Sequence, residues 1–200
     1  TGTITDYLGT PVWDADVFAV IGSEYRHTYT DFYGNYEIRG LRNGTHTVYA
    51  IPPSDLNLLP NSTPANVSLG EVTVANIILP KGGILTGFVT DTNGNPVYGA
   101  EVKASGPSRG SNYTDTDGSY TILALRTGSY TITATPLYSV GLLPNTTSAY
   151  VVQGEVTVAD IITLPSDTTL PIINITYPTE EAHLNVPSLW VNGTVTELNM

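Results

Sequence analysis

A duplication fills most of this chain and constrains its fold more than any other feature. Five stretches of the first half return in the same order in the second half, 85 residues later for the first stretch and 84 residues later for the others. The pairs are GTPVWDADV with GNPVYGAEV, TYTDFYGNYEI with NYTDTDGSYTI, GLRNGTHTVYA with ALRTGSYTITA, LLPNST with LLPNTT, and GEVTVANIILP with GEVTVADIITLP. The sequence therefore predicts two copies of one unit, residues 1–80 and 81–165, followed by a tail of residues 166–200.

Each unit has the pattern of about seven short strands. Val102 and Ala104 alternate with Glu101 and Lys103, which is typical of a strand with one buried face. Gly and Pro mark the turns, and Thr and Tyr supply residues suited to a pleated surface. Because no stretch shows helical periodicity, we expect an all-β protein. The predicted architecture is two tandem seven-stranded Greek-key β-sandwiches plus a two-strand segment at the C-terminus.

Composition excludes several classes of partner. Charged residues make up 12% of the chain, and its net charge of -11 reflects a shortage of Lys and Arg. Seven basic residues cannot form a patch that neutralises phosphates, so neither nucleic acid nor an anionic membrane surface is expected as a partner. No apolar run is long enough to span a bilayer, and cysteine is absent, which excludes disulfides and thiolate chemistry. No signal peptide is visible, so an exported protein would carry that segment outside these residues.

The repeated pattern G-x-V-x-D, G-x-P-V-x-G-A-x-V, T-D-x-x-G-x-Y-x-I, L-x-x-G-x-Y-x-V resembles the carboxypeptidase regulatory-like domain, a transthyretin-like (prealbumin-like) sandwich. The resemblance covers both units. It implies a non-enzymatic module, because catalysis in the metallocarboxypeptidases belongs to a separate zinc domain that nothing here resembles. Modules of this family occur as tandem spacers in microbial surface proteins, adhesins and outer-membrane receptors, so the resemblance implies an extracellular microbial protein, bacterial or archaeal, but no particular activity.

The two ends of the chain look incomplete. The first unit starts directly in its first strand, which suggests that an upstream part is missing or processed. In the tail, residues 171–178 and 188–197 read as two strands that resemble the opening of an immunoglobulin-like surface module. Two strands alone leave edges and an apolar face uncovered. Either the natural chain continues, or the tail adds strands to a neighbouring copy through Ile173, Ile175, Leu189, Trp190 and Val195.

Half of the asparagines lie in N-x-[ST] sequons, seven of fourteen. Chance would supply roughly three in a chain this rich in Ser and Thr. Either the protein is N-glycosylated, or a Thr-rich strand protein has acquired sequons by accident. The candidate acceptors are Asn43, Asn61, Asn66, Asn112, Asn145, Asn174 and Asn192.

Metal sites and catalytic sites have little support. Asp115 and Asp117 sit in an acidic turn that resembles the start of a calcium loop, but a strand follows directly, so a hairpin turn is the main interpretation and calcium the weaker one. His27, His46 and His183 lack metal-ligand spacing, and His46 falls at an inward strand position. No nucleophile elbow is present and no cleft is expected between carboxylates, so we predict no catalytic residues, no metal and no enzyme.

The sequence leaves two functions open. The preferred one is a glycosylated structural protein, a repeat unit of a cell-surface layer, stalk or filament that associates with its own copies. The alternative is an adhesin or carbohydrate-binding accessory module of a larger secreted protein. Under that alternative, Tyr29, Tyr49 and Tyr113 form an outward-facing sugar platform, while Tyr36, Tyr120 and Tyr130 face inward.

Overall fold

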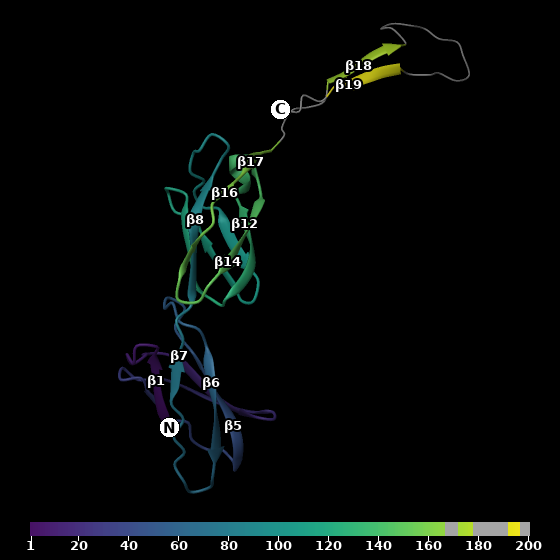
Figure 1. Cartoon of the computed structure of the whole chain (residues 1–200). Coiled ribbons are helices and arrows are strands. Elements are labelled where there is room, and N and C mark those ends of the chain that lie inside the picture. The colour runs from purple at the N-terminus through teal and green to yellow at the C-terminus, as the bar shows by residue number, and fades with distance from the viewer. Residues whose placement is uncertain (167–171, 178–191, 197–200) are drawn as a thin grey trace, which may run out of the picture. The chain divides into compact units, whose positions relative to one another are not determined.

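The computed structural model describes residues 1–166, 172–177 and 192–196. The chain divides into two compact units, Thr1–Leu164 and Pro165–Met200, and each is described by itself. The first unit contains two β-sandwiches, one for each sequence repeat (Figure 1).

Seven strands form the first repeat, arranged in two sheets. One sheet has the order β4-β1-β7 and the other the order β3-β2-β5-β6. Strand β1 pairs antiparallel with β4 and parallel with β7, so the last strand of the repeat returns beside the first. The strands are β1 (Gly2–Asp6), β2 (Asp16–Ile21), β3 (Glu24–Tyr29), β4 (Asn35–Tyr36), β5 (Gly44–Ile51), β6 (Asn61–Val67) and β7 (Ile77–Leu79).

The second repeat has the same plan. Its sheets have the orders β11-β8-β15, with β16 also paired to β8, and β10-β9-β12-β14. Among the residues described there is no α-helix, only one 3-10 turn, η1 (Tyr138–Val140). The all-β fold with two sandwiches is therefore confirmed. The strands are β8 (Gly83–Thr90), β9 (Glu101–Ser105), β10 (Arg109–Tyr113), β11 (Ser119–Leu125), β12 (Gly128–Thr135), β13 (Leu142–Leu143), β14 (Asn145–Val151), β15 (Val156–Val158), β16 (Ile161–Ile162) and β17 (Leu164–Pro165).

Each repeat encloses its own apolar core, built from alternate residues of facing strands. The inward positions predicted from alternation are buried in both repeats, as Val17 and Ala19 show for β2 and Val102 and Ala104 for β9. The two cores share no residue. The duplicated sequence therefore gives two separately packed sandwiches.

Gly2 and Gly87 occupy matching places where the first strand of each repeat passes the chain entering the closing strand. A Cβ atom on Gly2 would lie 2.1 Å from the carbonyl oxygen of Ala75, and one on Gly87 would lie 2.2 Å from that of Ala159. Only glycine allows the two backbones to approach so closely. This constraint explains why both copies keep glycine at this position.

The closing strand of the second repeat is broken between β15 and β16. The carboxylate of Asp160 accepts a hydrogen bond from the amide of Phe88 at 2.9 Å, in the place of a backbone carbonyl. The ladder therefore divides into β15 and β16. Asn76 does the same for the amide of Thr3 in the first repeat, also at 2.9 Å.

A buried threonine fastens the strand-connecting loop of each repeat. The hydroxyl of Thr114 donates to the carbonyl of Val97 at 2.6 Å and accepts from the amide of Ala100 at 2.8 Å. Thr30 makes the equivalent two bonds in the first repeat. Each hydroxyl thus satisfies two backbone groups that the core would otherwise leave unpaired.

The C-terminal unit contains an antiparallel pair, β18 (Ile172–Tyr177) and β19 (Asn192–Thr196). Both strands fall within the segments predicted to be extended. Leu189 and Trp190 lie outside the described residues. No helix among the described residues has the length and apolar character needed to cross a membrane.

Candidate functional site

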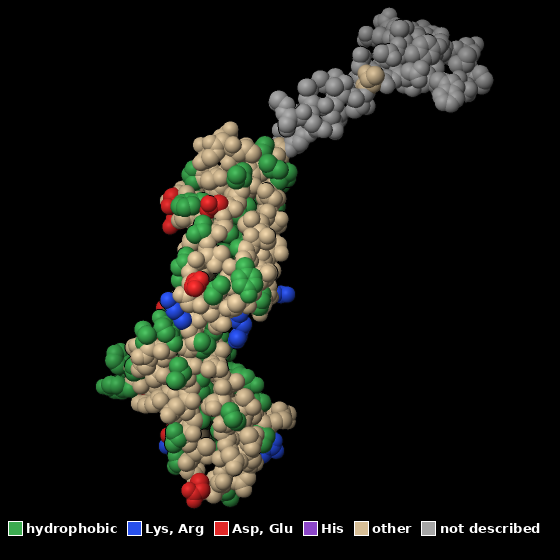
Figure 2. Space-filling view, viewed as in Figure 1, with side chains coloured by type: hydrophobic (Ala, Val, Ile, Leu, Met, Phe, Trp, Pro, Cys, Tyr) green, Lys and Arg blue, Asp and Glu red, His purple; other side chains and the backbone are tan. Residues whose placement is uncertain are grey.

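The titratable groups of the described residues do not converge on a reaction centre. No group of three or more His, Asp or Glu side chains able to hold a metal occurs in the described parts of the chain. His46 is buried, with Nε2 3.0 Å from the carbonyl oxygen of Arg42. His27 is exposed, with Nδ1 3.6 Å from a carboxylate oxygen of Asp16, and His183 lies outside the described residues. Charged side chains are sparse on the face shown in Figure 2.

The acidic turn of the second repeat is a tight turn between β10 and β11. These two strands lie in different sheets, so the predicted hairpin is wrong and the turn instead connects the two sheets. Gly118 has a φ of 77°, and its amide donates to the carbonyl of Asp115 at 2.9 Å. The carboxylates of Asp115 and Asp117 accept hydrogen bonds from the amides of Thr116 and Ser119. The bonds from Ser119 hold the pKa of Asp117 below its usual value. Each of the two carboxylates thus has a hydrogen-bond partner within the turn. Calcium binding at this turn stays a prediction.

Asn57 joins the two repeats. Its side-chain oxygen accepts a hydrogen bond from the amide of Ala124 at 2.8 Å, and its side-chain nitrogen donates to the carbonyl of Gly82 at 2.9 Å. The amide of Gly82 donates back to the carbonyl of Asn57 at 3.0 Å. One side chain therefore links the loop between β5 and β6 of the first repeat to two segments of the second. The matching position in the second repeat is Gly141, so the duplication gave no signal for this bridge.

Three sequon asparagines connect the two sheets of a sandwich. The amide nitrogen of Asn61 donates to the carbonyl of Ile78 at 2.8 Å, and that of Asn145 donates to the carbonyl of Ile162 at 2.7 Å. Asn112 bonds in the same way to the carbonyl of Thr121 at 2.8 Å. Asn61 and Asn145 are the first residues of β6 and β14, not members of a free loop. This hydrogen bond between the sheets explains why both repeats have asparagine at the position of Asn61 and Asn145.

The other sequon asparagines differ in setting. Asn43 and Asn66 are exposed, and their side chains make no hydrogen bond within the described part of the chain. Asn174 lies in β18, opposite Thr194 of β19, and Asn192 begins β19. Free side-chain amides suit an acceptor better than amides already bonded to the backbone. Asn43 and Asn66 are thus the better-placed acceptors in the first repeat.

The predicted strand-donating residues divide between β18 and β19. Ile173 lies opposite Val195 in the register of the pair, and Ile175 lies opposite Gly193. Three of the five candidates thus share one two-stranded ribbon. A ribbon of two strands is marginally stable by itself, so a further partner would stabilise it.

A row of rings covers the outer face of β2, β3 and β5. Phe18 stacks on Tyr49 with ring centroids 5.0 Å apart and lies 5.4 Å from Tyr25. His27 continues the row between Tyr25 and Tyr29. Tyr29, Tyr49 and Tyr113 are exposed, whereas Tyr36, Tyr120 and Tyr130 are buried, as alternation predicted.

Only Tyr29 and Tyr49 of this row were expected from the sequence. The counterpart of Phe18 in the second repeat is Lys103, and the counterpart of Tyr49 is Thr133. The row, which we call the aromatic ladder, therefore belongs to the first repeat alone. Comparing the aligned repeats would have found it.

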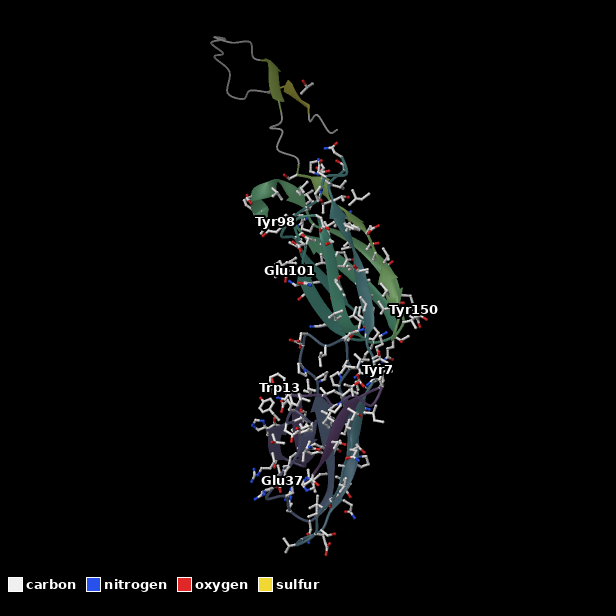
Figure 3. All side chains as sticks on the ribbon, turned by 90° about the vertical axis from the view of Figure 1, so that its left-hand side faces the viewer. Tyr7, Trp13, Glu37, Tyr98, Glu101 and Tyr150 are labelled. Carbon is white, nitrogen blue, oxygen red and sulfur yellow. The ribbon has the colours of Figure 1, made fainter. Side chains whose placement is uncertain are left out.

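An open pocket of about 590 Å³ lies at the end of the first repeat that adjoins the second. Its lining includes Tyr7 and Trp13, both labelled in Figure 3, together with Asp14, Asp55 and Lys81. Sequence analysis singled out none of these residues. They come from three separate loops, so only the folded chain brings them together.

Comparison with known proteins supports the predicted fold. Residues 84–165 match the family model of the carboxypeptidase regulatory-like domain, which confirms the resemblance for the second repeat. No curated protein matches the sequence significantly.

Several solved structures are similar at low identity. A Streptococcal ancillary pilin is 14% identical, with a TM-score of 0.46 over 82% of this chain and 61% of its own. A minor pilin of Streptococcus agalactiae is 14% identical, with a TM-score of 0.47 over 84% of this chain and 97% of its own. The shaft pilin SpaA of Lactobacillus rhamnosus GG is 11% identical, with a TM-score of 0.45 over 84% of this chain and 98% of its own. These values assign no function to this chain.

Proposed function

We propose that this chain is a structural protein of a microbial cell surface, a repeat unit of a surface layer, stalk or filament. The observation that carries the proposal is the bridge made by Asn57, because it fastens one sandwich to the next through both side-chain and backbone bonds. A protein whose task is to span distance needs such joints between modules, whereas a catalyst needs converging reactive groups. The proposal gives the chain no catalytic role.

Association with neighbouring copies is the mechanical part of the proposal. The ribbon of β18 and β19 would add its strands to another copy, supplying main-chain hydrogen bonds along an edge and apolar side chains to a groove. Ile173, Ile175 and Val195 are the described residues assigned to this contact. Leu189 and Trp190 belong to the same proposed contact.

Two adjacent substitutions test strand donation. In a regular strand, neighbouring side chains point to opposite faces, and Thr194 of β19 is exposed. We expect the unchanged protein to show concentration-dependent assembly in sedimentation velocity. Val195→Asp should abolish that assembly, and Thr194→Asp should leave it largely intact. Equal effects of both variants, or no assembly by the unchanged protein, would contradict the mechanism.

N-linked glycans are the second part of the proposal. A chain with 12% charged residues gains hydration from attached sugar. Asn43 and Asn66 are assigned as acceptors first, because their side chains are exposed and unbonded in the described structure. Intact mass of the native protein, followed by peptide mapping, tests the assignment. A mass that matches the bare polypeptide would remove glycosylation from the account.

A binding role is the second candidate function, and the aromatic ladder is the observation that favours it. Exposed, clustered aromatic rings on one repeat are unusual for a purely structural surface. Polysaccharide pull-down of the unchanged protein and of Tyr49→Ala tests this role, with Tyr113→Ala of the second repeat as the matched control. Binding lost only in Tyr49→Ala would favour the ladder as a sugar platform.

A further inference from the structure

The two repeats differ at the pocket that adjoins the joint, as they do at the aromatic ladder. Residues common to both repeats maintain the shared fold. A cluster of residues that differ between the repeats therefore indicates a property that only one repeat has. Tyr7 corresponds to Thr92, Trp13 to Tyr98, Asp14 to Gly99, Asp55 to Ser139 and Lys81 to Pro165. The pocket thus has an aromatic ring, two carboxylates and an ammonium group that the matching positions 84 or 85 residues later lack.

Asp14 carries a conformational cost at this pocket. Its φ is 58°, in the left-handed region, and the matching Gly99 has a φ of 73°. The backbone at this position requires a positive φ in both copies, and glycine meets that requirement without a steric penalty. The first repeat instead keeps a side chain there. Strain of this kind at a pocket points to a use for the carboxylate.

The carboxylates of the pocket are available to a ligand. The side chains of Asp14 and Asp55 make no hydrogen bond or ion pair with any residue that the structure describes, and both are exposed. Asp6 differs, because its carboxylate already accepts bonds from the amides of Leu8 and Thr10. Asp14 and Asp55 are therefore the acceptors that the pocket offers.

The apolar part of the pocket is an aromatic surface. Trp13 is 62% exposed and Tyr7 46% exposed. The Nζ atom of Lys81 lies 5.9 Å from the centroid of the Tyr7 ring, so a hydrogen-bond donor stands beside that ring. The pocket volume falls within the range of small-molecule sites, about 300–1,000 Å³.

We propose that this pocket binds a saccharide. A sugar ring has an apolar face that packs on an aromatic side chain, and hydroxyl groups that both donate and accept hydrogen bonds. Trp13 supplies the ring surface, Asp14 and Asp55 accept from hydroxyl groups, and Lys81 donates to a hydroxyl or ring oxygen. A purely apolar ligand would leave the carboxylates and the ammonium group unpaired, and an anion would meet two carboxylates. This site is separate from the aromatic ladder and adds a ligand to the structural role.

Four neutral hexasaccharides serve as probes, built of glucose in α or β linkage, N-acetylglucosamine and mannose. Titration of the full chain, followed by intrinsic fluorescence and calorimetry, should show at least one of them binding with a Kd of about 1 mM or tighter. A second titration uses glycans released from the native protein. It distinguishes binding of sugar on neighbouring copies from binding of polysaccharide of another source.

Substitutions assign binding to the pocket. Trp13→Ala should weaken binding at least about tenfold, a change of about 1.4 kcal/mol. Tyr98→Ala, the matching change in the second repeat, should leave it unchanged. Both side chains are exposed, so neither variant should unfold the protein.

Asp14→Gly provides a test with opposite signs. Because glycine removes the strain, the midpoint of thermal unfolding should rise by about 2–4 °C. The same change removes a carboxylate, so saccharide affinity should fall several-fold. If Asp14 served stability alone, Asp14→Gly would lower the midpoint of thermal unfolding and leave the saccharide affinity unchanged.

Three results would overturn the proposal. They are no binding of any probe, binding that persists in both Trp13→Ala and Asp14→Gly, and a thermal midpoint that falls in Asp14→Gly. Binding that is lost in Tyr49→Ala instead would place the sugar on the aromatic ladder. Assembly is measured independently by sedimentation velocity. Absence of saccharide binding would therefore not contradict the proposed structural role.

Discussion

The side-chain oxygen of Asn57 accepts a hydrogen bond from the amide of Ala124 at 2.8 Å, across 67 residues of chain and from one repeat to the other. Ala124 has a φ of 57°, and the matching position in the first repeat is Gly40 with a φ of 74°. The acceptor thus meets an amide in an uncommon backbone conformation. This side chain adds to the backbone bond from the amide of Gly82 to the carbonyl of Asn57 at the joint between the repeats.

Replacing Asn57 should loosen the joint. Asn57→Ala removes two hydrogen bonds to the second repeat, and each bond of this kind contributes about 0.5–1.5 kcal/mol. We expect faster hydrogen exchange at the amide of Ala124 and faster proteolysis between the repeats. Asn66→Ala is the control, since Asn66 is exposed with an unbonded side chain. Unchanged exchange at Ala124 would show that the bridge does not hold the joint.

Replacing Thr114 should destabilise the second repeat. Thr114→Val keeps the shape of the side chain but leaves the amide of Ala100 and the carbonyl of Val97 without their partner. Buried groups left unpaired cost about 1–3 kcal/mol each, so the free energy of unfolding should fall by at least about 2 kcal/mol. Chemical denaturation measures this loss. Thr116→Val, an exposed neighbour, should change it by less than about 0.5 kcal/mol.

Asn61 allows its structural role and its sequon to be separated. Asn61→Ala removes the bond to the carbonyl of Ile78 together with the sequon, whereas Thr63→Val removes the sequon alone. In protein made without glycosylation, Asn61→Ala should lower the free energy of unfolding by about 1 kcal/mol. Thr63→Val should be close to neutral, because valine suits a strand. Equal losses in both variants would argue against the sheet-to-sheet bond.

Stability should fall at high pH because of two buried tyrosines. Tyr36 and Tyr120 donate to the carbonyls of Ala75 and Ala159, and burial raises the pKa of each to about 12. The unfolded chain releases these protons near pH 10, so the folded state holds them more tightly between the two values. The stabilisation is complete below about pH 10 and is lost as the pH rises through about 12.

The expected loss is at most about 2–3 kcal/mol for each tyrosine. Denaturation at a series of pH values, with tyrosinate absorbance recorded in parallel, measures it. A free energy of unfolding that stays constant from pH 9 to about 12 would contradict the assignment.

Much of the fold was predictable because both copies of the repeat obey the same local rules. Alternating apolar residues at Val102 and Ala104 correctly predicted β9, and Gly118 correctly predicted a tight turn before β11. The expected hairpin was wrong, because β10 and β11 pair with other strands in different sheets. The broken closing strand was not predictable in the same way. Its cause is the side chain of Asp160 reaching the amide of Phe88, a contact between residues distant in sequence.

Candidate sites were harder to predict, because function lies where the copies differ. Sequon counting included Asn61 and Asn145 among the seven candidate acceptors, yet the side chain of each makes a hydrogen bond between the two sheets. The pocket at Trp13 and Asp14 could not be predicted from the sequence, because its lining comes from segments far apart in the chain. Only the folded chain brings Asp55 to the same pocket.

The structural role has one direct test, electron microscopy of the protein taken from its native source without denaturation. The account predicts regular fibres or a regular surface array, labelled along its length by antibodies against this chain. Dispersed single molecules under the same conditions, at concentrations found on the cell, would contradict it.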